Sequence, residues 1–213
     1  LNQNFTDFEL IISDNGSTDT TKEICNNFAI KDKRIRFFSH KKNLGAFWNF
    51  DFILKKACGK YFMWTAVDDK ILPGFYEKNI EILEKNSNVV CSASQVKYFG
   101  KNRNYWVERS TRGYFKALKK KMVKRFQNLQ NYPASGTFGT KFRYYLKLRG
   151  HHHVFYGIYR TEQLKKIWLL NVNFTESVDL VTMLGALRFG DFHVNDEVLM
   201  ERYDGGVSAQ GFF

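Results

Sequence analysis

Short apolar runs and longer periodic stretches alternate over the first hundred residues of the chain. Runs of roughly four to eight apolar, β-branched or aromatic residues predict strands, and apolar positions that recur every three or four residues predict helices. Strand and helix in alternation are typical of a parallel sheet covered by helices, so we predict an α/β fold. The predicted strands are 8–13, 34–39, 61–67 and 89–99, and the predicted helices are 21–29, 46–58 and one that begins at Pro73.

The first predicted strand ends in the polar loop DNGSTDTT, residues 14–21. We expect residues 10–12 to be buried in the sheet and Gly16 to make the turn that follows. Thr20 stands three residues before Glu23, a spacing that predicts a reciprocal cap at the start of the next helix. The loop therefore presents its carboxylates at the carboxyl end of a strand.

The pattern changes after about residue 102, where basic and aromatic residues increase. The expected elements are a basic helix with one apolar side, a long loop rich in glycine, serine, threonine and aromatic residues, two more helices and a last strand. They cover 113–126, 131–157, 160–170, 177–190 and 192–203, respectively. We interpret the chain as one domain with an irregular insertion at 102–155.

Composition narrows the class of protein. With 213 residues, of which 44% are hydrophobic, the chain is long enough for one continuous core and is not a disordered segment. The formal net charge of +12 favours an anionic partner: a nucleic acid, an acidic lipid or a phosphorylated small molecule. Three cysteines without a paired motif predict free thiols in a reducing compartment. The longest apolar run, 61–67, is far shorter than the about 20 residues of a membrane span.

Carboxylates gather at two predicted strand ends, where ligands bind in open α/β sheets. Asp14 and Asp19 follow the first strand, and Asp68 and Asp69 follow the strand at 61–67. Two adjacent carboxylates repel each other, and a hard divalent cation shared with substrate phosphates would relieve that repulsion. A solvated turn, with Asp69 near the cap of the next helix, is the alternative interpretation.

A third polar segment lies between these two clusters. Asn43 and Gly45 form a predicted turn at a helix start, and Lys41 and Lys42 precede them. Backbone N–H groups at a helix start, together with the lysines, would suit an anion. An ordinary N-terminal cap explains the same residues without a ligand.

Three motifs in this order resemble family 2 glycosyltransferases of the GT-A fold. They are FELIISDNGSTDTT, KNLGAFWNFDFILKKACGKYFMWTAVDD and PGFYEKNIEILEKN, and they cover about residues 1–100. The resemblance implies a mainly parallel sheet flanked by helices, with the fold's usual first strand missing from this sequence. It also implies an inverting hexosyltransferase that moves a sugar from a nucleotide-diphospho-sugar to an acceptor hydroxyl.

The resemblance also implies roles for the donor-side residues. Asp14 would lie beside the nucleotide base, and Asp68 would face the ribose. Asp69 would bind the Mg²⁺ or Mn²⁺ that holds the donor diphosphate. Asn43 and Gly45 match the second motif and would belong to the donor site.

An inverting transfer requires a general base that takes the proton of the acceptor hydroxyl. In the family this carboxylate opens a helix in the later half of the domain, and Asp179 takes the matching position in TESVDLVTMLGALRFG. Glu176 is the second candidate. Alternatively, both residues serve only to stabilise the first turn of a helix, where the helix dipole favours acidic side chains.

The resemblance assigns no role to two stretches of the chain. In ERYDGGVS the family's Arg-x-His pattern keeps Arg202 but has Asp204 in place of histidine, so no diphosphate contact is assigned there. The run 151–153 consists of three histidines, which cannot all face one metal ion in a regular element. Proximity of this run to the acceptor pocket stays a hypothesis.

The resemblance divides the single domain 1–213 into three parts: a nucleotide-sugar-binding part at 1–100, the insertion at 102–155 and a part for the acceptor and the base at 156–213. The helix at 113–126 suits either an anionic membrane surface or ordinary packing on the domain. We therefore expect a cytoplasmic enzyme that meets a saccharide or lipid-linked acceptor, with the inner face of the membrane as its place of contact, in the synthesis of a cell-surface polysaccharide or glycolipid.

Two other classes of function stay open. Aromatic residues interleaved with lysine and arginine also describe a nucleic-acid-binding domain, although that reading leaves the acidic clusters without a purpose. A non-catalytic scaffold that binds a nucleotide-sugar would keep the donor residues and would not depend on Asp179.

Overall fold

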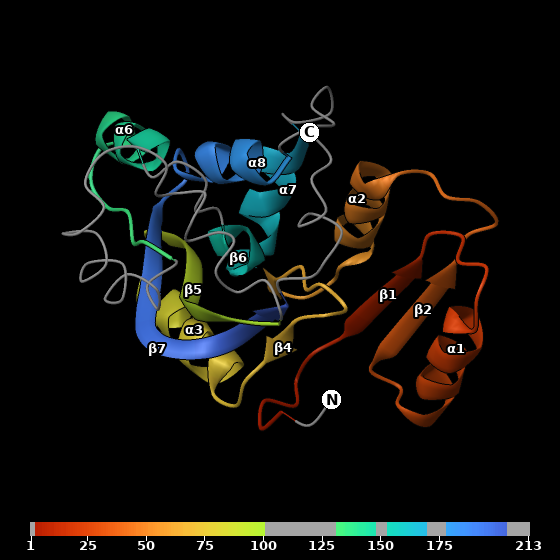
Figure 1. Cartoon of the computed structure of the whole chain (residues 1–213). Coiled ribbons are helices and arrows are strands. Elements are labelled where there is room, and N and C mark those ends of the chain that lie inside the picture. The colour runs from red at the N-terminus through yellow and green to blue at the C-terminus, as the bar shows by residue number, and fades with distance from the viewer. Residues whose placement is uncertain (1–2, 101–130, 148–152, 170–177, 204–213) are drawn as a thin grey trace.

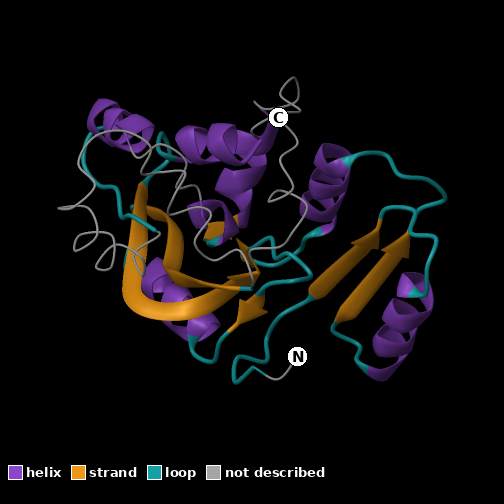
Figure 2. Cartoon of the chain, in the orientation of Figure 1, coloured by secondary structure: helices purple, strands orange, loops and turns teal. Residues whose placement is uncertain are grey.

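The computed structural model describes residues 3–100, 131–147, 153–169 and 178–203. Figures 1 and 2 show two sheets side by side, each flanked by helices. The predicted basic helix at 113–126, the alternative base Glu176, His151, His152 and Asp204 lie outside the described residues. Within the described residues, no helix has the length and apolar character that a membrane crossing requires.

The smaller sheet pairs strand β1 with strand β2 in parallel, and the larger sheet has the strand order β3-β6-β5-β7-β4. The strands are β1 Leu10–Asp14, β2 Ile35–Ser39, β3 Tyr61–Phe62, β4 Lys70–Ile71, β5 Val89–Phe99, β6 Ile158–Arg160 and β7 Asp191–Tyr203. The helices are α1 Thr21–Lys31, α2 Ala46–Lys56, α3 Phe75–Lys85, α6 Phe138–Lys147, the 3-10 helix η1 His153–Tyr156, α7 Thr161–Leu169 and α8 Val178–Ala186.

The α/β prediction is confirmed, and the two long strands β5 and β7 form the centre of the larger sheet. They run parallel to each other, as β1 and β2 do. The short strands β6 and β4 run antiparallel to their neighbours. The loops that follow β1 and precede α2 belong to the smaller sheet, and the loop after β3 belongs to the larger one.

The first strand is less buried than expected. Residues 10–12 are only half-buried, and α1, which packs on this sheet, has no buried residue. We expected these residues to be buried in the sheet, whereas among the described strands β1 pairs only with β2. A strand with one neighbour and one thinly packed face stays partly open to solvent.

Three other local predictions are wrong. The strand expected at 61–67 ends at Phe62, because its partner β6 is only 3 residues long and offers no further ladder. Thr20 makes no side-chain cap, and the carboxylate of Asp19 instead accepts a hydrogen bond from the Thr21 N–H at 3.0 Å. Part of the loop expected at 131–157 is the helix α6.

Aromatic side chains form the contact between the two sheets. Trp64, 3% exposed, stacks on Phe155 with ring centroids 4.8 Å apart and lies 4.9 Å from Trp168. Phe47 of α2 stacks on Trp168, with ring centroids 5.2 Å apart. These contacts fix α2, the segment after β3, η1 and α7 relative to one another.

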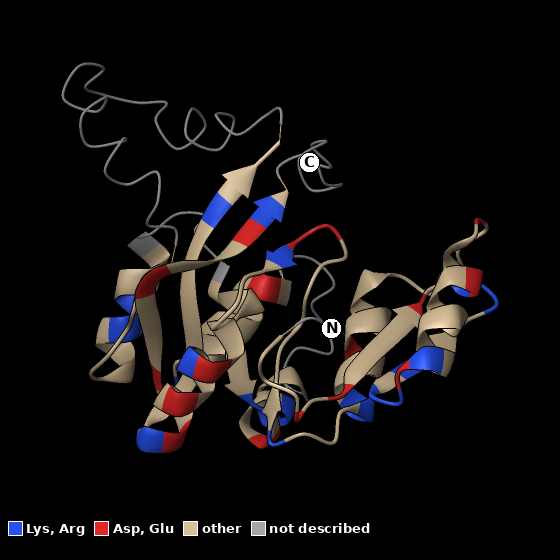
Figure 3. Cartoon of the chain, turned by 90° about the horizontal axis from the view of Figure 1, so that it is seen from below, with Lys and Arg blue, Asp and Glu red and all other residues tan. Residues whose placement is uncertain are grey.

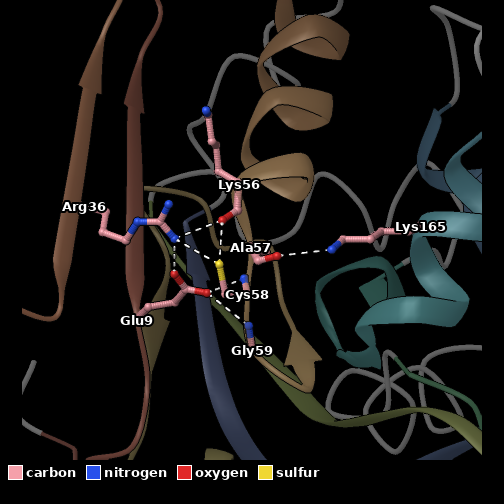
Figure 4. Close-up of polar contacts among 7 residues, drawn as sticks. All are labelled: Glu9, Arg36, Lys56, Ala57, Cys58, Gly59 and Lys165. Atoms are coloured by element: carbon pink, nitrogen blue, oxygen red, sulfur yellow. Dashed lines mark hydrogen bonds and ion pairs between the residues drawn. The ribbon is translucent and has the colours of Figure 1, made fainter.

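A polar cluster fastens the start of β1 to the end of α2 (Figure 4). The Glu9 carboxylate accepts hydrogen bonds from the N–H groups of Cys58 at 2.6 Å and Gly59 at 3.1 Å, and it pairs with Arg36. Arg36 also donates to the Lys56 carbonyl at 2.9 Å. Burial alone would raise the pKa of Glu9, but the hydrogen bonds from Cys58, Arg36 and Gly59 hold it below its ordinary value.

The cysteines are free thiols, as predicted. Cys91 is fully buried in β5, where burial raises the pKa of its thiol. Cys58, by contrast, is exposed.

Glu9→Gln should lower the free energy of unfolding by about 1–2 kcal/mol at pH 7, because it weakens two hydrogen bonds and an ion pair. Since the folded pKa of Glu9 lies below the ordinary value of 4.5, the contribution of its charge is fully present above pH 4.5. It is lost as the pH falls through the folded pKa. Urea unfolding at a series of pH values measures this, with the exposed Glu23→Gln as control. An equal difference at pH 7 and pH 3 would contradict the role of the charge.

Candidate active site

The loop after β1 is organised by the carboxylate of Asp14. This side chain is 4% exposed, and it accepts hydrogen bonds from the Ser17 N–H at 2.9 Å and from the Ser39 hydroxyl at 3.1 Å. Hydrogen bonding by Ser17 outweighs burial, so the pKa of Asp14 lies below its ordinary value and the group stays charged. The buried carboxylate of Asp14 thus fixes the conformation of the loop.

The neighbouring Asn15 joins this loop to the turn before α2. Its amide nitrogen donates to the side-chain oxygen of Asn43 at 2.9 Å and to the Gly45 carbonyl at 3.1 Å. Its amide oxygen accepts from the Leu44 N–H at 3.0 Å. Asn43 in turn accepts from the Gly45 N–H at 2.8 Å. The two predicted donor motifs are therefore in direct contact, with the N-terminus of α2 beside them.

Gly16 allows the same two loops to approach. Its φ of +84° is one that glycine adopts readily, and a Cβ atom here would lie 2.6 Å from the Lys42 carbonyl carbon and 2.7 Å from the Asn43 nitrogen. Only a residue without a side chain fits.

The two carboxylates after β3 lie in different environments. A turn closed by the hydrogen bond from the Asp69 N–H to the Ala66 carbonyl, at 3.3 Å, leaves Asp68 exposed. The Asp69 side chain is 2% exposed, and it forms an ion pair of 3.1 Å with Nε of Arg202, whose side chain is 16% exposed. Asp69 also accepts from the Tyr203 N–H at 3.3 Å. Burial raises the pKa of Asp69, and the Arg202 guanidinium opposes that rise only in part.

Strand register explains the ion pair. In the antiparallel pair of β4 and β7, Lys70 lies opposite Glu201, so the residues on either side, Asp69 and Arg202, meet at the edge of the sheet. The two residues are far apart in the sequence. Their meeting depends on the return of the last strand to the short strand β4.

Tyr156 lies against the Arg202 side of this ion pair. The Arg202 guanidinium carbon is 4.2 Å from the centre of the Tyr156 ring. Burial raises the pKa of Tyr156; Arg202 opposes the rise, and the negative charges of Asp69 and Asp179 add to it. The Arg202 guanidinium thus contacts both the Asp69 carboxylate and the Tyr156 ring.

Asp179 stands in the first turn of α8, as predicted. It is half-buried, and its Oδ1 atom accepts a hydrogen bond from the Leu180 N–H at 2.8 Å. The first turn of a helix is a place where the helix dipole favours an acidic side chain.

The structure thus joins some of the predicted site residues. The loop that begins at Asp14 contacts Asn43 and Gly45 through Asn15, Asp69 pairs with Arg202, and Asp179 opens α8. Among the described residues, no group of three or more histidine, cysteine or acidic side chains could hold a metal ion. The adjacent carboxylates have the right chemistry for Mg²⁺, which takes one or two protein carboxylates and completes its shell with substrate oxygens. Because Arg202 already neutralises Asp69, a cation fits there only after the guanidinium moves.

Comparison with known proteins now identifies the family. The sequence model named Glycosyl transferase family 2 matches residues 1–150. The chain is a member of glycosyl transferase family 2. This confirms the resemblance that the three motifs suggested.

Curated relatives match parts of the chain. An uncharacterized glycosyltransferase of Haemophilus influenzae is 35% identical over 94 residues, which are 44% of this chain and 29% of the relative. An uncharacterized glycosyltransferase of Methanocaldococcus jannaschii is 33% identical over 125 residues, 58% of this chain and 43% of the relative. The GalNAc(5)-diNAcBac-PP-undecaprenol beta-1,3-glucosyltransferase of Campylobacter jejuni is 35% identical over 74 residues, 34% of this chain and 24% of the relative. The chain spans less than half the length of each.

Solved structures of S. aureus TarS share the fold of this family member. TarS 1-349 in complex with UDP-GlcNAc has a TM-score of 0.66 at 18% identity and covers 99% of this chain and 54% of the TarS chain. The complex with UDP has a TM-score of 0.60 at 20% identity, with 94% and 53% covered. This likeness confirms the GT-A fold class predicted from the sequence.

Sequence reasoning missed three residues of this glycosyltransferase domain. Asn15 stands inside the first motif, but nothing local shows that its amide reaches the second motif. Tyr156 lies in the segment VFYG before the predicted catalytic helix, and its burial under Arg202 depends on the fold. For Arg202 the sequence contains no signal of its pairing with Asp69.

Gly16→Ala should lower the free energy of unfolding by about 2–4 kcal/mol, from the left-handed backbone and from the overlap with the 41–45 turn. Thermal or urea unfolding measures the loss. Gly136→Ala is the matched control, because Gly136 has a φ of +99° but nothing within 4 Å of the added carbon. A loss in Gly16→Ala no larger than in Gly136→Ala would show that the close approach of the two loops is not strict.

Proposed function

We propose that this domain transfers a sugar from a nucleotide-diphospho-sugar to an acceptor hydroxyl, with inversion at the anomeric carbon and with Mg²⁺ or Mn²⁺. Membership of glycosyl transferase family 2 supports the class of reaction. The observation that carries the proposal is the direct contact between the loop after β1 and the turn before α2, where the Asn15 side chain bonds to Asn43, Leu44 and Gly45. Two loops joined in this way beside the start of a helix form a surface that suits a nucleotide diphosphate.

The donor would bind where the loop after β1 meets the turn before α2. Backbone N–H groups at a helix N-terminus favour an anion, so the start of α2 at Ala46 suits the diphosphate. In this proposal the loop shaped by Asp14 faces the nucleotide, Asn43 and Gly45 form its second wall, and the exposed Asp68 faces the ribose.

Asp179 would act as the general base. Its carboxylate takes the proton of the acceptor hydroxyl while that oxygen forms the new bond to the anomeric carbon. The bond between the anomeric carbon and the donor phosphate oxygen breaks, and the nucleoside diphosphate leaves with that electron pair. A divalent cation held at Asp69 would supply neutralising charge for the diphosphate. Because the attack comes from the face opposite the leaving group, the configuration inverts.

The names of the relatives suggest the substrates. TarS was solved with UDP and with UDP-GlcNAc, and the C. jejuni relative is named for an acceptor linked to undecaprenol diphosphate. We propose a UDP-sugar as donor and a saccharide or lipid-linked acceptor in cell-surface polysaccharide or glycolipid synthesis. The reaction would then take place in the cytoplasm, at the inner face of the membrane.

The two alternative functions predict other behaviour. A nucleic-acid-binding domain needs a basic surface, whereas Figure 3 shows acidic and basic positions interspersed along α3 and at the ends of β5 and β7. Such a domain would bind RNA with a steep dependence on salt and without Mn²⁺. A donor-binding scaffold would bind the nucleotide-sugar and show no transfer.

Asp179→Asn should reduce sugar transfer by about 10²–10⁴-fold, since the amide cannot accept the proton of the acceptor hydroxyl. Binding of UDP should stay within about twofold of the unaltered protein, because Asp179 is not part of the donor loops; this is well under the tenfold that 1.4 kcal/mol would give. Single-turnover transfer with a UDP-sugar, together with calorimetry of UDP, measures both.

The matched control is Asp7→Asn, which removes an exposed carboxylate elsewhere in the chain. Transfer at the unaltered rate in Asp179→Asn would remove Asp179 from the role of base. A loss of UDP binding together with transfer would instead indicate that the substitution disturbs the fold.

Binding of UDP should be tighter in the presence of Mn²⁺, and Asp69→Asn should remove that dependence, because the amide is a weak ligand for a hard cation. Calorimetry of UDP and of GDP, each with and without Mn²⁺, measures the effect and identifies the base of the nucleotide. Asp196→Asn, an exposed aspartate in β7, is the control. Equal UDP binding with and without the metal would refute the metal site, and no binding of either nucleotide would refute the donor site.

A further inference from the structure

Asp69 and Arg202 form the most buried ion pair near the proposed donor site, with side-chain exposures of 2% and 16% and an Nε–Oδ2 distance of 3.1 Å. The guanidinium is enclosed on its other side by the Tyr156 ring, whose centre lies 4.2 Å from its carbon atom. Tyr156 is in turn fixed by its contact with Phe155, at 5.1 Å between ring centroids. The cation thus lies between a carboxylate and an aromatic face.

Arg202 thus occupies Asp69, the carboxylate to which the proposed function assigns a divalent cation. A buried carboxylate is strongly destabilised without a compensating positive charge. Asp69 can therefore be neutralised by the guanidinium or by a metal ion. Two cations at the same buried oxygens would repel each other.

We propose that Arg202 competes with the divalent cation for Asp69, and that Tyr156 is the positioning residue that holds Arg202 in the competing place. The proposal rests on the proposed function in one respect, which is the assignment of the metal to Asp69. In the free protein the guanidinium neutralises the aspartate. Metal binding requires the guanidinium to move away, so the free protein binds the cation weakly.

This competition explains why the metal ion and the donor should bind together. A guanidinium released from Asp69 is a bidentate donor that pairs well with phosphate oxygens. A nucleoside diphosphate therefore offers the displaced Arg202 a new partner at the moment when the metal needs Asp69. Metal and donor should bind more tightly together than either does alone, and bare metal should bind poorly.

Calorimetry of Mn²⁺ alone, without nucleotide, tests the competition in the full chain. Arg202→Gln should tighten Mn²⁺ binding by about tenfold, because the competing charge is gone. Tyr156→Leu should tighten it by about threefold, since the guanidinium loses its aromatic platform, which is worth about 0.5–1 kcal/mol. Tyr156→Phe keeps the ring and removes only the hydroxyl, which also interacts with Arg202, so its Mn²⁺ affinity should lie between those of the unaltered protein and Tyr156→Leu.

The matched control is Arg34→Gln. Arg34 has the same kind of surroundings away from the site, with an ion pair to Asp32 at 2.7 Å and the Phe8 ring at 4.4 Å. Its loss should leave Mn²⁺ affinity unchanged. The double variant Asp69→Asn/Arg202→Gln should lose the tightening, which locates the metal at Asp69.

A measurement on the unaltered protein guards against a variant that fails to fold. Titration with diamagnetic Mg²⁺ and UDP, followed by NMR of the arginine Nε–H groups, should shift the Arg202 resonance and leave that of Arg34 in place. An unmoved Arg202 resonance at saturating ligand overturns the proposal.

The outcomes separate this inference from the proposed function. Mn²⁺ affinity that is unchanged or weaker in Arg202→Gln overturns the competition, and UDP binding in the same samples leaves the donor site standing. Tighter Mn²⁺ binding in Arg202→Gln without UDP binding in any sample supports the competition and overturns the donor site.

Discussion

The packing of aromatic rings around Trp64 is the contact on which the rest of this structure depends. The indole is almost fully buried, and it touches Phe155 and Trp168 while α2 adds Phe47 to the same group. It lies in the segment between β3 and the Asp68–Asp69 turn, and Phe155 directly precedes Tyr156. One apolar cluster therefore sets the position of the smaller sheet, of the acidic turn and of the tyrosine beneath Arg202. Rings of this size bury a large apolar area, which compensates for the partly open β1.

The site shows two ways to keep a carboxylate inside a protein. Asp14 is held by a backbone N–H and a hydroxyl of its own loops, and its pKa lies below the ordinary value. Asp69 is held chiefly by a cation, and burial raises its pKa. The first arrangement fixes the conformation of a loop. In the second, the proposed exchange of Arg202 for a metal ion would leave the carboxylate neutralised.

Much of the site could be predicted because its residues follow local rules. Carboxylates that end a strand, a glycine in a tight turn and an aspartate at a helix start are visible in a few neighbouring residues, and so the positions of Asp14, Gly16 and Asp179 were found. Local rules failed where contact with a second segment of the chain determines the structure. The strand expected at 61–67 ends early because its partner β6 is short. Residues 10–12 are only half-buried because β1, among the described strands, pairs with β2 alone.

The sequence by itself determined the α/β class, the order of the long elements and the family, since these rest on periodicity and on motifs of adjacent residues. Only the tertiary structure decided which of these residues meet. Asn15 reaches the turn before α2 because two loops are adjacent in space, and Arg202 reaches Asp69 because the last strand returns antiparallel to β4. Such contacts depend on strand register over 130 residues of chain, and no local pattern encodes that register.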